Sequence, residues 1–176
     1  MTIRALSDVS GASNGAIYNA FGSRDGLLAS VWAREATRFL EFQRDIADST
    51  LTASGPTEAI VAAALAPATY AERDEFGAQL LLAVTLDDLR TPDLAESQRD
   101  QLAGLRRTLT TLLTVLAVEQ WGREDATALT LMKYCVVDLP GALLLGSGNV
   151  SDPLARHALS LAVRGIVSES PPAPDR

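Results

Sequence analysis

The sequence predicts an all-α protein, and three observations support this prediction. Ala and Leu, two strong helix formers, dominate the composition. Apolar residues recur every three or four positions over long stretches, as on one face of a helix. No stretch alternates apolar and polar residues, and no hairpin turn joins two β-branched runs. Hydrophobic residues make up 47 % and charged residues 21 % of the chain, which is typical of a folded protein and not of a disordered one.

Capping residues mark where several of the expected helices begin. Thr2, Ser13 and Ser23 can each cap a helix through the side-chain hydroxyl. The expected helices cover about residues 3–10, 13–20, 23–48, 56–70, 74–89, 92–120, 124–145 and 153–167. We expect a loop over residues 50–55. We also expect a kink or break at Pro140, because proline removes a backbone donor and clashes with the preceding turn.

Charge and cysteine content restrict the classes of function. The net charge of −7 argues against a protein that coats nucleic acid over its whole surface. A small DNA-reading module is still compatible, because residues 1–24 carry +1 and the remainder −8. The single Cys135 cannot form an internal disulfide, which favours the reducing cytoplasm. We expect no signal peptide and no spanning helix, since the apolar run at about residues 59–70 contains Pro67 and a span needs roughly 20 residues.

Residues 2–28 have the layout of a helix-turn-helix, whose second helix enters the major groove of DNA. A tight, glycine-containing turn over residues 11–13 joins two short helices. Ile17 and Phe21 lie one helical turn apart, so both can pack inward. The residues left for the outer face are small or can bond phosphates and base edges. They are Ser13, Asn14, Gly15, Tyr18 and Asn19.

Over the same residues the chain resembles the tetracycline-repressor (TetR) family of transcriptional regulators. The family signature has a Thr-started helix, an Ala-Gly-Val-Ser-like turn, then Gly-x-(Leu/Ile)-Tyr-x-x-Phe and Ser-Lys-x-x-Leu. The matching positions are Gly11, Ser13, Gly15, Ile17, Tyr18, Phe21, Ser23 and Leu27. The resemblance implies a ligand-responsive DNA-binding regulator, most simply a repressor, that acts as a homodimer on a palindromic operator in double-stranded DNA.

The resemblance also assigns DNA-contacting roles to single residues. These residues are Thr2, Ser13, Asn14, Gly15, Tyr18, Asn19 and Arg24. Positions 13–15 would face base edges, and position 19 could touch a base or a phosphate. The other three would bind phosphates, which position the protein without reading the sequence.

The chain departs from the family pattern in two ways. Four positions carry unusual residues that weaken the small core of the helix-turn-helix: Ser10, Ala12, Ala20 and Gly26. The family also has a helix before this motif, whereas here Met1 directly precedes the second family helix. A misassigned start codon, a shortened chain and a degenerate regulator are three explanations, and we expect weak DNA affinity if the chain is truly this short. The alternative function is a dimeric small-molecule-binding or interaction protein that has lost DNA binding.

Residues 29–168 are expected to form a ligand-binding and dimerisation domain, and residues 169–176 a flexible tail. In the family, the last two helices form an isologous four-helix interface between two subunits. The residues expected in that interface are Leu143, Leu144, Leu154, Ala158, Leu161, Ala162 and Ile166. An ordinary core within one subunit is the alternative explanation for this apolar face.

A ligand pocket is expected among the middle helices, mostly apolar and with few polar groups. The candidate lining residues are Phe39, Phe42, Tyr70, Phe76, Gln79, Leu82, Trp121, Met132, Tyr134, Cys135 and Asp138. Asp138 stands between two apolar residues, where a buried carboxylate would need a partner. Its alternatives are a solvent-facing position and a cap at the Pro140 break. The expected ligand is an apolar or weakly polar small molecule.

The sequence holds no catalytic or metal-binding pattern, so we predict neither an enzyme nor a cofactor. The single His157 follows Arg156 on the expected dimer helix, where a surface or interface position is usual. Cys135 has no nearby His or basic cluster, so a buried, inert thiol is expected. Asp87 and Asp88 are adjacent on an expected helix and point in different directions, so they do not form a working pair of carboxylates.

Overall fold

The structure is a computed structural model that describes residues 23–83, 94–145 and 150–173. Every regular element in these ranges is helical and none is a strand, which confirms the all-α prediction. The elements are α3 (Arg24–Ser54), α4 (Pro56–Arg73), α5 (Glu75–Ala83), α6 (Glu96–Trp121), α7 (Ala126–Lys133), the π-helical turns η1 (Tyr134–Asp138) and η2 (Gly141–Leu145), and α8 (Pro153–Val167).

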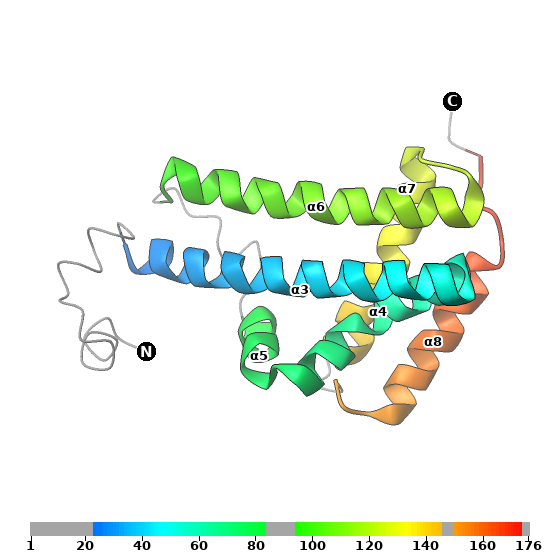
Figure 1. The fold of residues 1–176 in the computed structure, drawn as a ribbon, viewed down its shortest axis with the longest axis horizontal. Coiled ribbons are helices and arrows are strands. Elements are labelled where there is room, and N and C mark those ends of the chain that lie inside the picture. Colours follow the sequence, from blue (N-terminus) through cyan, green and yellow to red (C-terminus); the bar gives the residue numbers. More distant parts are fainter. Residues whose placement is uncertain (1–22, 84–93, 146–149, 174–176) are drawn as a thin grey trace.

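The two longest described helices set the long axis of the molecule. In Figure 1, α3 and α6 run side by side along that axis, and α4, α5 and α8 lie on the other side of α3. The most extensive helix pair is α3 with α4, and α8 packs against α4. Helix α3 therefore contacts α4, α5 and α6, so a group bound between these helices would touch α3.

Helix α3 begins as expected and ends later than expected. The Ser23 hydroxyl accepts a hydrogen bond from Gly26 N at 2.9 Å, which caps the first turn. The loop expected over residues 50–55 is wrong, because the helix continues to Ser54. The hydroxyls in this polar run bond carbonyls of the preceding turn, as Thr50 Oγ1 does with Ile46 O at 2.7 Å. Gly55, at φ 86°, then breaks the helix.

The other boundaries agree with the expected ranges to different degrees. Helix α4 starts at Pro56 as expected and continues slightly further, to Arg73. Helix α6 begins at Glu96 rather than near residue 92, and Gly122 ends it with a φ of 64°. The last helix has the expected bounds. Asp152 caps it by accepting from Leu154 N at 2.9 Å.

The single helix expected over residues 124–145 is instead α7 followed by two wide turns. Leu139 N donates to Tyr134 O five residues earlier, which is the π-helical spacing, and η2 follows Pro140. Proline cannot donate to the carbonyl four residues before it, so a regular α-helix cannot continue unchanged through this point. The irregularity expected at Pro140 is thus present as wide turns on both sides of the proline.

One described stretch bears on the expectation that no helix spans a membrane. Ala126–Leu145 has 20 residues and a mean hydropathy of 1.5, so by length and composition alone it could cross a bilayer. This is weak evidence for a span, because core helices of soluble proteins can pass the same test. The stretch also holds an ion pair, in which Lys133 Nζ lies 2.7 Å from Asp138 Oδ1. The structure is compatible with a soluble protein.

Two hydrophobic clusters hold the helices together. We call the larger one the main core; it joins parts of α3, α4, α6, α7 and α8 around fully buried Met132, Leu144 and Leu159. We call the smaller one the α3–α6 cluster. Its buried members are Ala29, Ala33, Ala36, Leu40, Leu94, Leu102 and Leu105. The two clusters meet along α3 and α6, where Leu109 packs against both.

Candidate functional site

A cavity of about 370 Å³ lies between the main core and the α3–α6 cluster. Helices α3, α4, α5 and α6 and the η1–η2 region all contribute to its wall. The lining residues are Trp32, Ala36, Phe39, Leu40, Gln43, Pro67, Tyr70, Ala78, Leu81, Leu105, Arg106, Leu109, Val136, Val137, Pro140, Leu145 and Val150. This volume lies within the range of small-molecule sites, and the wall is mostly apolar as such sites usually are.

Few polar groups reach this wall. Apart from the Trp32 indole, they belong to Gln43, Tyr70 and Arg106. Arg106 is exposed on α6, whereas Gln43 is only 2 % exposed. Gln43 Nε2 donates to Ala63 O in α4 at 2.9 Å, so this amide joins α3 to α4 at the cavity.

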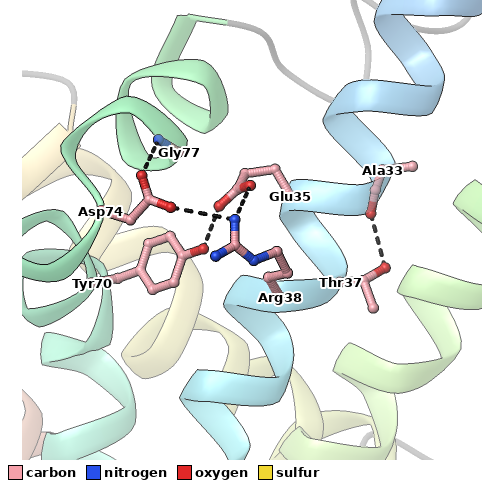
Figure 2. Close-up of polar contacts among 7 residues, drawn as sticks. All are labelled: Ala33, Glu35, Thr37, Arg38, Tyr70, Asp74 and Gly77. Carbon is pink, nitrogen blue, oxygen red and sulfur yellow. Dashed lines mark hydrogen bonds and ion pairs between the residues drawn. The ribbon is translucent and has the colours of Figure 1, made fainter.

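Tyr70 connects the cavity to a polar network on α3. Its ring centroid lies 5.4 Å from those of Phe39 and Phe42, both on α3. Its hydroxyl donates to the Glu35 carboxylate, as Figure 2 shows. Burial, together with this hydrogen bond, raises the pKa of the Tyr70 hydroxyl. The group therefore remains a protonated donor at physiological pH.

The network continues through charged groups to the start of α5 (Figure 2). Arg38 Nη1 lies 3.1 Å from Glu35 Oε2 and 3.3 Å from Asp74 Oδ2. Asp74 Oδ1 in turn accepts from Gly77 N at 2.8 Å. A side chain at Gly77 would collide with the Glu35 carboxylate and force it to shift, so glycine here leaves room for Glu35 to bond Tyr70 and Arg38. The network thus ties α3, α4 and α5 together beside the cavity.

The expected pocket residues are divided by the structure. Phe39 and Tyr70 line the cavity. Phe42 lies beside it, between the Tyr70 ring and the Arg73 guanidinium, which is 4.8 Å from the Phe42 centroid. Leu82 lies in α5, but its side chain is outside the described residues.

The remaining candidates lie elsewhere. Phe76 is 85 % exposed. Gln79 is also exposed and does not line the cavity; its amide donates to Glu75 Oε1 at 3.1 Å. Tyr134 is half-exposed. Asp138, for which burial was one expectation, is partly exposed and pairs with Lys133.

Three further candidates belong to the main core rather than to the cavity wall. Met132 and Cys135 are fully buried there, and Trp121 packs against it at the far end of α6, where its indole donates to Val167 O at 3.3 Å. Burial raises the pKa of the Cys135 thiol to about 11, in agreement with an unreactive cysteine.

Most lining residues were missed because they are small or aliphatic. One signal was present in the sequence: Trp32, Ala36, Phe39, Leu40 and Gln43 recur at helical spacing, so they share a face of α3. A glutamine on such an apolar face indicates a buried hydrogen bond.

Six of the seven expected DNA-contacting residues lie outside the part of the chain that the structure describes. These six residues are Thr2, Ser13, Asn14, Gly15, Tyr18 and Asn19. Arg24 is the first residue of α3, and its side chain is also outside the described part.

The expected interface residues fall into three groups, which are exposed, fully buried and half-buried. On α8, Leu154 is 72 % exposed and Leu161 is 57 % exposed, and Ala158 between them is exposed as well. Leu144, in contrast, is fully buried in the main core and is not available to a partner. The half-buried members, which pack partly within the subunit, are Leu143, Ala162 and Ile166.

Part of the stretch expected to be a flexible tail makes contacts. Arg123, after α6, donates to the carbonyls of Pro171 and Pro172 and pairs with Asp125 at 2.7 Å. Pro171 is also buried. Residues 174–176 lie outside the described part of the chain.

Comparisons with protein-family models, curated proteins and solved structures found no match to this chain. Among the described residues, no group of three or more His, Cys, Asp or Glu side chains is arranged to hold a metal ion.

Proposed function

We propose that this protein is a ligand-responsive, DNA-binding transcriptional regulator of the tetracycline-repressor type, acting as a cytoplasmic homodimeric repressor. The observation that carries the proposal is the position of the cavity relative to α3. This helix begins at Arg24, directly after most of the helix-turn-helix string, and supplies five residues of the cavity wall. A molecule in the cavity would therefore touch the helix that leads to the predicted DNA-binding segment.

The polar network supports coupling between the cavity and this helix. Tyr70 lines the cavity on one side and donates to Glu35 of α3 on the other. A ligand that displaces Tyr70 would disturb a bond that holds α3 against α4. Coupling requires the ligand to favour one position of α3 over another. The cavity wall contains Tyr70 and other residues of both α3 and α4, so a ligand there would touch both helices.

The exposed face of α8 supports a dimer. Leu154, Ala158 and Leu161 follow one another at helical spacing and form an apolar stripe. The same stripe on a second copy would make an isologous contact, which matches a palindromic operator. We expect Leu161→Glu to give monomers in sedimentation velocity, whereas Val115→Glu, at an exposed apolar site on α6, should leave the dimer intact.

The decisive test is fluorescence anisotropy of the chain on its own upstream intergenic DNA and on a scrambled duplex, at two salt concentrations. We expect selective binding that weakens steeply with salt, because phosphate contacts release counterions. Arg24→Ala should weaken binding to both duplexes and lower the salt slope by about 1. Arg44→Ala, which removes an exposed arginine further along α3, is the matched control.

Equal, weak binding to both duplexes by the wild-type chain would contradict the proposal. A dimer that binds small molecules without reading DNA would then be the better description.

A further inference from the structure

The buried amide of Gln43 has an unsatisfied half. Gln43 is 2 % exposed and forms part of the cavity wall. Its Nε2 donates to Ala63 O at 2.9 Å, but its Oε1 has no hydrogen-bond partner among the described residues. Buried acceptors without a partner are rare and destabilising, so this oxygen calls for an explanation.

The orientation of this amide follows from the chemistry of α4. In a regular helix Ala63 O would accept from the backbone N–H of residue 67, four positions later. Residue 67 is proline, which has no N–H, so this carbonyl is left without its helical partner. Gln43 Nε2 takes that place. Because a carbonyl can only accept, the NH₂ group must face Ala63, and Oε1 cannot exchange positions with it.

The remaining groups on the wall do not satisfy Oε1. The Tyr70 hydroxyl donates its proton to Glu35, and Arg106 is exposed. A resident water would need two to four polar partners to be held, and the rest of the wall is almost entirely apolar. A lone acceptor in apolar surroundings fits a donor carried by an apolar ligand.

We infer that the cavity binds a neutral, mainly apolar molecule carrying one hydroxyl or N–H donor, and that Gln43 Oε1 accepts from that donor. The inference rests on the ligand-binding part of the proposed function and specifies the ligand's chemistry. An anionic ligand group does not fit here for two reasons. It would place a second acceptor against Oε1, and the described lining residues include no buried cation that could compensate its charge.

The test uses two rigid probes that differ by one hydroxyl, 4-phenylphenol and biphenyl. Their dissociation constants are measured by titration calorimetry for the wild-type chain and for Gln43→Met, which keeps the length of the side chain and removes the acceptor. We expect the variant to bind 4-phenylphenol about tenfold more weakly, equivalent to about 1.4 kcal/mol. Biphenyl affinity should change by less than about twofold, since biphenyl has no donor.

A second pair of variants separates binding from folding. Gln43→Met also removes the donor to Ala63 O and can weaken α4. Pro67→Ala restores a backbone N–H for that carbonyl, so Pro67→Ala with Gln43→Met is compared with Pro67→Ala alone. The selective loss of 4-phenylphenol affinity should persist in this pair, with unchanged circular dichroism.

The outcomes distinguish this inference from the proposed function. Equal changes for both probes, or none for either, would overturn the role of Gln43 while leaving a ligand site. Failure of both probes to bind the wild-type chain would overturn the cavity as a site for this class of ligand. DNA selectivity, measured separately, decides the regulatory function in either case.

Discussion

The main core and the α3–α6 cluster are both built largely from Ala and Leu, yet they differ in how far they border the cavity. Three of the seven buried members of the α3–α6 cluster line the cavity, whereas Val136 is the one buried member of the main core among the lining residues. In the main core, alanines of α4 are buried in one cluster with large side chains such as Leu144 and Leu159. In the α3–α6 cluster, Ala36 and Leu105 border the cavity. The comparison shows that small residues give either close packing or a binding space, according to what lies opposite them.

The largest effect that follows is the loss of a large side chain from the main core. Met132→Ala should lower the free energy of unfolding by about 2–5 kcal/mol, because the fully buried site cannot refill. Leu109→Ala, at the half-buried cavity wall, should cost clearly less. Urea denaturation of both variants checks this. Equal losses would contradict the difference drawn between the filled core and the cavity wall.

Enlarging an alanine should separate the clusters further. Ala64→Leu, in the main core, should cost about 1–3 kcal/mol by overpacking. Ala36 is part of the cavity wall, so the atoms added by Ala36→Leu would extend into the cavity. This variant should change stability little and should reduce 4-phenylphenol binding. A stable Ala64→Leu variant together with a poorly folded Ala36→Leu variant would reverse the assignment of the open space.

Tyr70 lies between the clusters, and its hydroxyl should contribute a smaller amount. Tyr70→Phe removes the donor to Glu35, which keeps Arg38 as a partner, so a loss of about 1–2 kcal/mol is expected in thermal or urea unfolding. Tyr134→Phe, at a half-exposed site, is the control and should be near neutral. Equal stabilities for the two variants would contradict a stabilising role for the hydrogen bond between Tyr70 and Glu35.

At the far end of the main core, Asp125 should contribute a few degrees of thermal stability. It accepts from Thr127 N and Ala128 N at the start of α7 and pairs with Arg123. Asp125→Ala should lower the Tm by about 2–4 °C. Asp45→Ala, an exposed site on α3, serves as the control and should have almost no effect.

The same carboxylate predicts a pH dependence. The hydrogen bond from Arg123 holds the pKa of Asp125 down, at about 2, from an unfolded value of 3.8. A lowered folded-state pKa means that its stabilisation is present above the unfolded pKa and is lost as pH falls through the folded pKa. The difference in Tm between wild type and Asp125→Asn should therefore be constant above about pH 5 and shrink between about pH 4 and 2. A constant difference down to pH 2 would argue against the ion pair.

The smallest expected effect is the labelling of Cys135 by a thiol reagent, because this thiol should not react in the native chain. It is fully buried in the main core, and burial raises the pKa of its thiol to about 11. The native chain should show no thiol by Ellman's reagent within minutes, and the urea-unfolded chain should show one. Rapid native labelling would mean that the main core opens more readily than its packing indicates.

The sequence predicted the helical boundaries best where a single residue determines the backbone. Pro153 with Asp152 set the start of α8, and Gly122 ends α6. Polar composition alone was a poor guide at residues 50–54, because hydroxyls can bond the helix's own carbonyls and need no loop. Leu51 in this stretch also packs against the main core, a tertiary contact that no local pattern contains.

The cavity could be predicted only in part, because a cavity depends on the space that packed helices leave between them. Aromatic residues were natural candidates, and Phe39 and Tyr70 do line it. Whether Met132 fills a core or borders a space depends on the approach of α4, α7 and α8, which no local pattern contains. The partnership of Gln43 with the carbonyl left by Pro67 likewise needs two helices in contact.

The most direct test of the account is DNA binding with and without a molecule in the cavity. Anisotropy titrations on the upstream intergenic duplex would compare the wild-type chain with Ala36→Leu, each with and without saturating 4-phenylphenol. The account predicts that the probe changes the dissociation constant for DNA by about fivefold or more in the wild-type chain, and leaves Ala36→Leu unchanged. An unchanged dissociation constant in the wild-type chain, with the cavity occupied, would contradict the claim that α3 connects the two sites.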